Sequence, residues 1–281
     1  MPMSESPYLI IGHITADITP QGRVLGGTVS YGMSVARQFA YDPILVTSAA
    51  REEPLLEALD CTHCVIIPAA QTTTFENIYE GSHRTQYIHG VASPIRPDDI
   101  PTSVQSARYV HLAPIADEID PEIAFMFPDA TVMLTPQGWM RRWDDKGRVR
   151  FKRFDNEAVL RAVDIVVMSR QDIAEAPELE QEYAGLVKHL FVTDGANGGV
   201  YYHNGTPQSY TAYPVQEVDP TGAGDVFATA LLASLAQTGD DLHKSLRVAA
   251  KLAALSVTRI GINNTVRADE VKAVLAEVNS F

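Results

Sequence analysis

Short apolar segments that alternate with helix-forming segments constrain the fold of this 281-residue chain more than any other feature. The first of them, Tyr8–Ile11, ends at Gly12 and is typical of a buried strand that stops at a turn. Thr28–Phe39 then carries small and apolar residues at helical spacing. Strands of the same kind are expected at Ile44–Val46, Val65–Ile67, Tyr109–Leu112, Thr131–Leu134, Asp164–Met168 and Leu190–Thr193. Continuous apolar strands separated by helices are typical of parallel sheets. The sequence therefore predicts an α/β fold, a doubly wound and mainly parallel sheet with helices on both faces.

Two segments depart from this alternation and predict hairpins. Thr72–Val91 alternates β-branched and aromatic residues with polar ones around a Glu-Gly-Ser turn, which is typical of a hairpin with one face open to solvent. Val200–His203 and Gln208–Tyr213 flank the pair Asn-Gly, which favours a two-residue hairpin turn. Helices are expected at Glu52–Leu59, Gly224–Gln237 and Leu242–Ile260. Since no repeat and no linker divides the chain, a single domain spanning residues 1–281 is expected.

The chain is acidic, which narrows its range of partners. It carries 22 Lys and Arg against 35 Asp and Glu, a formal net charge of −13. Such a surface repels phosphodiester backbones, so no nucleic-acid partner is expected. No apolar run approaches the ~18–20 residues of a membrane span, and the first residues do not resemble a signal peptide. The expectation is therefore no membrane partner and a cytoplasmic location.

Cys61 and Cys64 are the only two cysteines. A redox Cys-x-x-Cys motif would stand at a helix N-terminus, and a structural zinc site would need two more ligands at a similar spacing. Neither context surrounds this pair. Two incidental thiols before the strand Val65–Ile67 are expected, which suits a reducing cytoplasm.

The segment Val218–Phe227 carries the strongest indication of function. Small residues at 221–224 crowd a turn before a long apolar helix, where converging backbone N–H groups and the helix dipole favour an anion. Asp225 stands at the start of that helix. A carboxylate beside an anion site can accept a proton from an alcohol while the site holds a phosphoryl group. On spacing alone, a helix-capping role for Asp225 is an equal alternative.

One motif resembles the C-terminal signature of the PfkB, or ribokinase-like, family of kinases: Asp219-x-Thr221-Gly222-Ala223-Gly224-Asp225. It lies in the last quarter of the chain, as it does in that family, and the resemblance extends over essentially the whole chain. The resemblance implies that Asp225 is the catalytic base and that Gly222, Ala223 and Gly224 form the anion hole. A requirement for a monovalent cation such as K⁺, near Asp219 and Thr221, stays open.

The same resemblance implies where the substrate binds. Gly12–Asp17 resembles the family's opening strand, whose terminal aspartate binds substrate hydroxyls, and a carboxylate accepts two such hydrogen bonds at once. The pair Gly26-Gly27 resembles the glycines beneath the sugar, although Gly-Gly before a helix is also an ordinary turn signal. Residues 13–25 and 72–92 are implied to supply the strands of a lid that covers the substrate.

On the nucleotide side, residues 192–199 and 258–261 resemble the segments that face ATP. The implied ATP-binding residues are Ser169, Thr193, Gly195, Gly198, Gly261 and Asn263. Glycine loops of this kind are also ordinary turns. The family usually holds Mg²⁺ through water with an Asn-x-x-Glu motif, and the aligned residues here run from Ser169 to Asp172. Asp172 is therefore expected to hold Mg²⁺ through water, whereas Ser169 also suits a simple helix cap.

Softer motifs resemble the myo-inositol kinase branch of the family: Thr73–Glu76, Pro94–Pro101, Gln137, Arg141, and serine at position 169. A polyol site needs several donors and acceptors in a dry pocket, and the candidates are Asp17, Asn77, Gln137 and Arg141. The alternative for Arg141 is a solvated basic pair with Arg142. The expected activity is ATP-dependent phosphorylation of a hydroxyl on a small sugar or cyclic polyol such as myo-inositol. Ribose, a ketohexose and a nucleoside are alternative substrates.

Two other classes of protein compete with a kinase. A non-catalytic sugar- or nucleotide-binding regulator on the same fold is supported only by the departure at Ser169 and Asp172, and an intact Asp225 argues against it. A dinucleotide-dependent oxidoreductase is disfavoured because the first strand ends in Gly-His-Ile-Thr rather than Gly-x-Gly-x-x-Gly. A homodimer through the lid strands would cover an exposed sheet edge.

Overall fold

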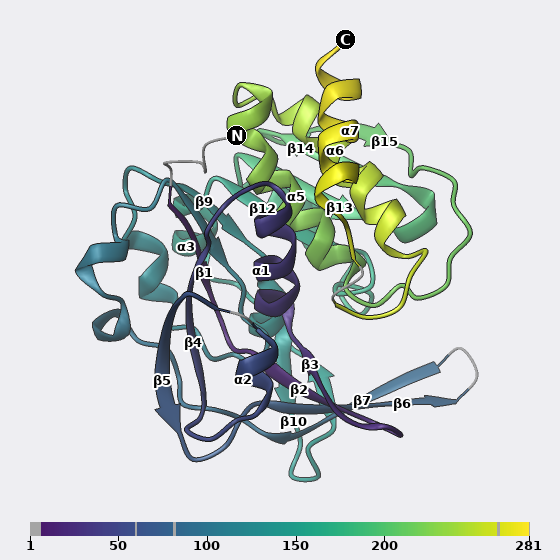
Figure 1. The fold of residues 1–281 in the computed structure, drawn as a ribbon. Coiled ribbons are helices and arrows are strands. Elements are labelled where there is room, and N and C mark those ends of the chain that lie inside the picture. Colours follow the sequence, from purple (N-terminus) through teal and green to yellow (C-terminus); the bar gives the residue numbers. More distant parts are fainter. Residues whose placement is uncertain (1–6, 60, 81–82, 263–264, 281) are drawn as a thin grey trace.

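A computed structural model describes residues 7–59, 61–80, 83–262 and 265–280 of the protein (Figure 1). The main sheet is built from β1 (Tyr8–Ile11), β4 (Ile44–Ala50), β5 (His63–Ala69), β8 (Tyr109–Leu112), β9 (Thr131–Leu134), β12 (Ile165–Ser169), β13 (His189–Thr193), β14 (Gly199–His203) and β15 (Thr206–Tyr210). Its order is β15-β14-β13-β12-β9-β8-β1-β4-β5. The strands from β13 to β5 run parallel, and β14 and β15 join one edge antiparallel. The predicted doubly wound, mainly parallel fold is confirmed.

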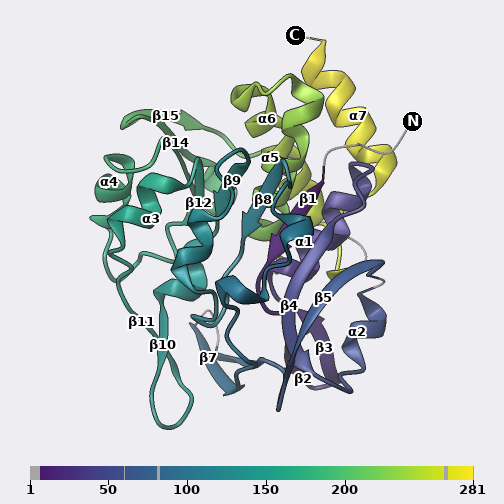
Figure 2. The same ribbon diagram turned by 90° about the vertical axis from the view of Figure 1, so that its left-hand side faces the viewer.

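Successive residues of each strand bury opposite faces of this sheet, as the two-residue period of a strand requires. Tyr8 and Ile10 pack into one core, and Leu9 and Ile11 into the other. The first core is covered by α1 (Thr28–Gln38), α5 (Ala223–Thr238), α6 (Leu242–Ser256) and α7 (Ala268–Asn279). The second is covered by α3 (Glu157–Ala162), α4 (Leu179–Ala184) and the segment that follows β8. Figure 2 shows these layers on either side of the strands.

A second, four-stranded sheet has the order β3-β2-β6-β7. Its members are β2 (Thr15–Thr19), β3 (Gly22–Gly26), β6 (Thr74–Glu80) and β7 (His83–Gly90). These strands gather at the end of the molecule to which β1 leads, at the bottom of Figure 1. We call this four-stranded sheet the small sheet. Because β2 follows β1 after three residues, the small sheet begins where the first parallel strand ends.

A hairpin of β10 (Arg141–Trp143) and β11 (Val149–Phe151) was not expected from the sequence. Its tip meets the small sheet, since Ile88 N–H donates to the carbonyl of Gly147 at 2.8 Å and Tyr87 forms a bridge with Arg148. A side chain at Gly147 would collide with the Ile88 carbonyl at 2.4 Å. Figure 2 shows the hairpin projecting on the side of β7.

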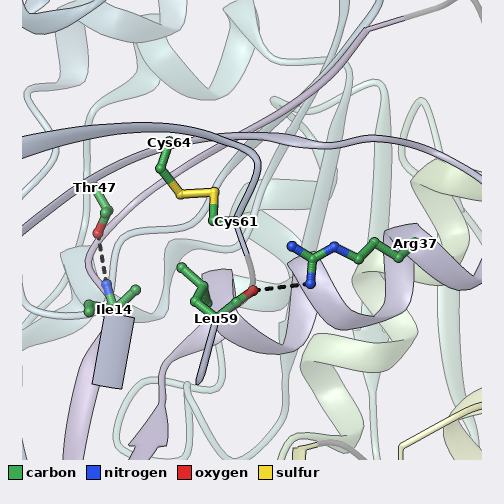
Figure 3. The surroundings of a disulfide bond; sticks show 6 residues. All are labelled: Ile14, Arg37, Thr47, Leu59, Cys61 and Cys64. Carbon is green, nitrogen blue, oxygen red and sulfur yellow. Dashed lines mark hydrogen bonds between the residues drawn. A yellow bond between two sulfur atoms is a disulfide. The ribbon is translucent and has the colours of Figure 1, made fainter. Parts of the chain in front are cut away.

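The two cysteines form a disulfide, so the expectation of two incidental thiols is wrong. Cys61 follows the short helix α2 (Leu55–Ala58), and Cys64 lies in β5 with its Cα 5.8 Å away, within the usual range for a disulfide. Figure 3 shows the bond beside Leu59, whose carbonyl accepts from the guanidinium of Arg37 at 3.0 Å. The turn between α2 and β5 thus brings together two residues whose spacing alone gave no pairing.

Most predicted elements are present, with ends shifted by a few residues. The predicted helix Glu52–Leu59 is reduced to α2, and Leu242–Ile260 ends at Ser256. The hairpin turn at Asn204-Gly205 has positive φ at both residues, as its sequence predicted. Among the residues described, none of the helices combines the length and apolarity that crossing a membrane requires.

Candidate active site

Asp225 lies in the first turn of α5, at the end of the main sheet that carries the small sheet. The amide groups of a helix's first turn have no carbonyl partner within the helix, so they point outward as donors for an anion. Asp225 is partly buried and is hydrogen-bonded to Thr28, the first residue of α1. The carboxylate and the helix N-terminus therefore share one location.

The environment of Asp225 raises the pKa of its carboxyl group to about 6. Burial is the largest cause, because it disfavours the charged form. The negative charges of Asp172 and Asp17 raise the pKa further. The hydrogen bond from Thr28 and the positive charge of Arg141 lower it. These effects also show that the structure brings the side chains of β2, β10 and the loop after β12 within electrostatic range of Asp225. A carboxylate whose pKa is near the working pH suits a general base.

Gly222 allows the turn before α5 to close. It has a φ of 78°, in the left-handed region that favours glycine. An added Cβ would lie 2.2 Å from the ring of Tyr31 in α1. Burial raises the pKa of Tyr31 strongly, and the charges of Asp225, Asp219 and Asp17 raise it further. Ala223 and Gly224 follow at the start of α5, so the predicted glycine turn packs directly on α1.

The predicted substrate residues of the first lid segment meet in the small sheet. Asp17 lies in β2 and accepts a hydrogen bond from the Thr15 hydroxyl at 3.1 Å. A Cβ on Gly26 would lie 2.4 Å from Asp17 Oδ2, so a larger residue there would displace the Asp17 side chain. Gly27 precedes α1 with a φ of 86°. Gly26 therefore leaves the space that the aspartate side chain occupies.

Arg141 reaches the same place from β10. Its guanidinium donates to the carbonyl of Ile115 at 3.0 Å and lies over the ring of Phe75, 5.4 Å from the centroid. Phe75 pairs with Asp17 across β6 and β2, so both side chains lie on one face of the small sheet. Asn77, two residues further along β6, shares that face and accepts from Gln86 at 3.1 Å. Arg141 is held by these contacts, unlike a solvated surface arginine.

Gln137 and Asp172 contact each other directly. Gln137 Nε2 donates to Asp172 Oδ1 at 2.8 Å, and Asp172 Oδ2 accepts from both the amide and the hydroxyl of Ser169 at 2.8 Å. Asp172 therefore receives three donors from the protein. Mg²⁺ in phosphoryl-transfer sites is held by one or two carboxylates, water and substrate phosphates, so a single carboxylate beside Ser169 fits that ion. Gln137, predicted as a substrate residue, thus contacts the carboxylate that is expected to hold Mg²⁺.

The predicted nucleotide residues lie at the ends of neighbouring strands. Thr193 ends β13 beside Ser169 at the end of β12. Gly195 and Gly198 flank the short turn between β13 and β14, where a cavity of about 260 Å³ is lined by the following: Arg170, Asp194, Asn197, Gly199, Val200, Ser209, Tyr210 and Thr211. Gly261 follows α6 in a loop with a φ of 86°. Asn263 lies outside the described residues.

Asp219 and Thr221, the residues considered for a monovalent cation, lie just before the glycine turn. Asp219 Oδ1 accepts from the Thr221 amide at 3.0 Å, a contact that orders the turn without any ion. Among the described residues, no group of three or more His, Cys, Asp or Glu is arranged to hold a metal.

Three contributors to the site were missed from the sequence. Thr28 and Tyr31 belong to the first turn of α1, and their position directly after Gly26-Gly27 was the signal that could have found them. Phe75 stands within the motif Thr73–Glu76, but its stacking with Arg141 depends on the tertiary fold.

Sequence comparison finds kinases among the relatives of this chain. Residues 154–269 match the profile of the pfkB family carbohydrate kinase. An ATP-dependent ribose-1-phosphate kinase of Halopiger xanaduensis is 30% identical over 201 residues, which are 67% of this chain and 62% of that protein. An inositol 3-kinase of Zea mays is 25% identical over 229 residues, 80% of this chain and 58% of the relative. The chain thus spans about three fifths of the length of these two curated relatives.

Structure comparison agrees on the fold. A pyrophosphate-dependent kinase in the ribokinase family, complexed with a pyrophosphate analog and myo-inositol, superposes with a TM-score of 0.77 at 17% identity. The match covers 95% of this chain and 99% of that one. At this level of identity the likeness shows a shared fold.

Proposed function

Because this chain belongs to the PfkB, or ribokinase-like, family of carbohydrate kinases, we propose that it transfers a phosphoryl group from ATP to a hydroxyl of a small sugar or cyclic polyol. The single observation that carries the proposal is the position of Asp225. It stands at the N-terminus of α5, with a raised pKa, within electrostatic range of Asp17 and Arg141.

In the proposed mechanism, Asp225 accepts the proton of the attacking hydroxyl. The amide groups at Gly222 and Gly224 would face the transferring oxygens, where the helix dipole favours negative charge, while the Ala223 amide donates to the Pro220 carbonyl at 3.2 Å and holds the turn closed. Thr28 keeps the carboxylate oriented through its hydrogen bond. Since positioning and electrostatics supply most of the catalysis in phosphoryl transfer, this arrangement contains the groups that the reaction needs from the protein.

The donor and its metal would lie beside Asp172. Mg²⁺ bound there would neutralise charge on the donor phosphates. Ser169 and Gln137 fix the Asp172 carboxylate by three hydrogen bonds, so its orientation is set before any ligand arrives. The proposed donor contacts are Thr193, Gly195, Gly198, Gly261 and Asn263, and a K⁺ ion beside Asp219 and Thr221 belongs to the same proposal.

A neutral polyol suits the acceptor side better than a phosphorylated sugar. Two carboxylates, from Asp17 and Asp225, face it against one guanidinium, from Arg141. This balance disfavours an anionic acceptor. Hydroxyl groups can donate to Asp17 and accept from Arg141 and Asn77. We therefore propose myo-inositol as the first acceptor to test, ahead of ribose, a ketohexose and a nucleoside.

The test is a donor-by-acceptor matrix. ATP and pyrophosphate, each with Mg²⁺, are combined with myo-inositol, ribose, ribose-1-phosphate, fructose, cytidine and adenosine, and the phosphorylated product is detected by mass spectrometry. We expect turnover with ATP and one neutral acceptor. Turnover with pyrophosphate but not with ATP would show that pyrophosphate is the phosphoryl donor. Turnover with ribose-1-phosphate alone would contradict the expectation of a neutral acceptor.

The second candidate is a sugar- or nucleotide-binding regulator without turnover. It is favoured by one observation, namely that both carboxylate oxygens of Asp172 are already occupied by protein donors. Calorimetric binding of ATP and myo-inositol, with no product in any combination, would establish it.

Location and assembly belong to the same proposal. An ATP-dependent kinase works where ATP is plentiful, so we propose a cytoplasmic location, although the Cys61–Cys64 disulfide is unusual for a reducing compartment. Ile18 and Ile78 expose 37% and 40% of their surface in the small sheet, and a homodimer through that sheet would cover them. Sedimentation of the wild type and of Ile18→Lys, which is expected to be monomeric, tests the dimer.

A further inference from the structure

A buried carboxylate lies behind the residues of the acceptor side. Glu118 is 3% exposed and belongs to the turn that follows β8. Its oxygens accept from three backbone amides: Ile115 at 2.9 Å, Ala116 at 2.7 Å and His13 at 2.9 Å. Hydrogen bonds from amides to a charged acceptor are stronger than neutral ones, and a buried carboxylate without them would be costly. This group therefore fixes two separate pieces of backbone at one point.

The first piece of backbone leads to Asp17 and to the roots of the small sheet. His13 is fully buried, and its ring nitrogens lie 2.7 Å from the Thr73 hydroxyl and 2.9 Å from the Ser93 carbonyl. Thr73 Oγ1 also accepts from the Ala92 amide at 3.0 Å. With the ring proton on Nε2, every partner is matched: Nε2 donates to Ser93 and Nδ1 accepts from Thr73. His13, which lies four residues before Asp17, thus joins the residue before β6 to the residues after β7.

The second piece of backbone leads to Arg141. The amide of Ile115 is held by Glu118, and the carbonyl of the same residue accepts from the Arg141 guanidinium at 3.0 Å. Arg141 lies over Phe75 and acts electrostatically on Asp225. The positions of the guanidinium and of Asp17 are therefore tied to one carboxylate.

We infer that Glu118 is a positioning residue of the acceptor site, which sets Arg141 through Ile115 and the small sheet through His13. The inference rests on the proposed kinase function, because it assigns a role in acceptor binding. Both oxygens of Glu118 accept from backbone amides, so its effect on the reaction passes through the residues it holds.

The first experiment compares Glu118→Gln with wild type. Glutamine keeps the size of the side chain, but its NH₂ group faces backbone amides that are themselves donors, so at least one amide loses its partner. We expect the acceptor KM to rise by about tenfold or more, about 1.4 kcal/mol, with the ATP KM unchanged. Glu122→Gln is the matched control, because that side chain is exposed in the same segment of the chain, and it is expected to behave as wild type. Equal rises in both KM values, or none, would overturn the inference.

A double-mutant cycle separates positioning from a general loss of stability. Arg141→Lys removes the guanidinium that Ile115 orients. If Glu118 acts through Arg141, the effects of Glu118→Gln and Arg141→Lys on kcat/KM are less than additive. Additive losses would leave Glu118 as a purely structural residue.

Hydrogen exchange gives a readout that needs no activity. The amides of His13, Ile115 and Ala116 are expected to exchange faster in Glu118→Gln, and at the wild-type rate in Glu122→Gln. Unchanged exchange in the first variant would refute the inference. Wild type that phosphorylates none of the acceptors would refute the proposed function instead, so the two failures are distinct.

If Glu118→Gln does not fold, the connection can be cut elsewhere. Thr73→Val removes the hydroxyl between His13 and Ala92 while leaving the buried carboxylate intact. We expect a raised acceptor KM with an unchanged ATP KM. A wild-type acceptor KM in this variant would overturn the inference.

Discussion

The acceptor side and the donor side of the site are built in different ways. On the acceptor side, polar side chains are buried and joined across distant segments: His13 and Thr73 are fully buried, and Glu118 is 3% exposed. On the donor side, Arg170 pairs with Asp194 while 46% and 30% of their side chains are exposed, and Gly195 lies open to solvent. Buried polar networks fix a geometry, whereas exposed ion pairs contribute little. The comparison indicates a rigid acceptor side and, outside the hydrogen-bonded Asp172 carboxylate, an adaptable donor side.

Asp225 lies between the two sides, and its loss is expected to have the largest effect. Asp225→Asn keeps the size and the contact with Thr28 but removes the base, so kcat is expected to fall by about 10³-fold. Calorimetry should show ATP and acceptor binding close to wild type. Near-wild-type turnover would refute the assignment of the base, and loss of ATP binding would show that the carboxylate serves the donor side.

A pair of matched substitutions tests whether the two sides are separable. Asp17→Asn removes a charged hydrogen-bond acceptor, so the acceptor KM is expected to rise by about 10–100-fold, with little change in the ATP KM. Asp172→Asn should leave the acceptor KM nearly unchanged and raise the Mg²⁺ concentration needed for half-maximal rate. Initial rates over a grid of acceptor, ATP and Mg²⁺ concentrations measure both. If each variant changes the acceptor KM and the Mg²⁺ requirement equally, the acceptor side and the donor side are not separable.

The strands of the main sheet were predictable because they are buried on both faces. Tyr8–Ile11 and Tyr109–Leu112 read as continuous apolar runs and appear as strands with those bounds. The glycine turn at Gly222–Gly224 was predictable for a similar reason, since a local motif determines a local structure. The signal for α7 was also present, because Val271, Val274 and Val278 recur at helical spacing, but it was overlooked.

Other features depend on contacts that no local pattern encodes. Arg141–Trp143 is polar and becomes a strand only because it pairs with Val149–Phe151 and the hairpin meets the small sheet at Ile88. Glu118 belongs to no motif, and its partner His13 lies 105 positions away in sequence, so their contact exists only once β1 and β8 pair. The acceptor side was therefore harder to predict than the glycine turn, since its parts come from five segments of the chain.

The pH dependence gives a finer test of how the two sides meet at Asp225. The base works when deprotonated, and its pKa is about 6, so kcat/KM is expected to fall about tenfold per pH unit below pH 6. Asp172→Asn removes a negative charge that raises this pKa and should move the acid limb to lower pH. Arg141→Met removes a positive charge that lowers it and should move the limb to higher pH, while Asp17 and Tyr31, which also face Asp225, are unchanged in both variants. Identical profiles would show that neither side influences the base.

The smallest expected effects concern stability and compare one buried contact with one exposed pair. Thr47 is fully buried, and its hydroxyl accepts from the Ile14 amide at 2.9 Å, next to His13 (Figure 3). Thr47→Val leaves that amide without a partner and is expected to lower the free energy of unfolding by about 1–3 kcal/mol. Asp194→Asn weakens the exposed ion pair with Arg170, which keeps its second partner Glu180, and should cost less than about 1 kcal/mol. Urea denaturation of both variants measures the difference, and equal losses would mean that the donor side is held as firmly as the acceptor side.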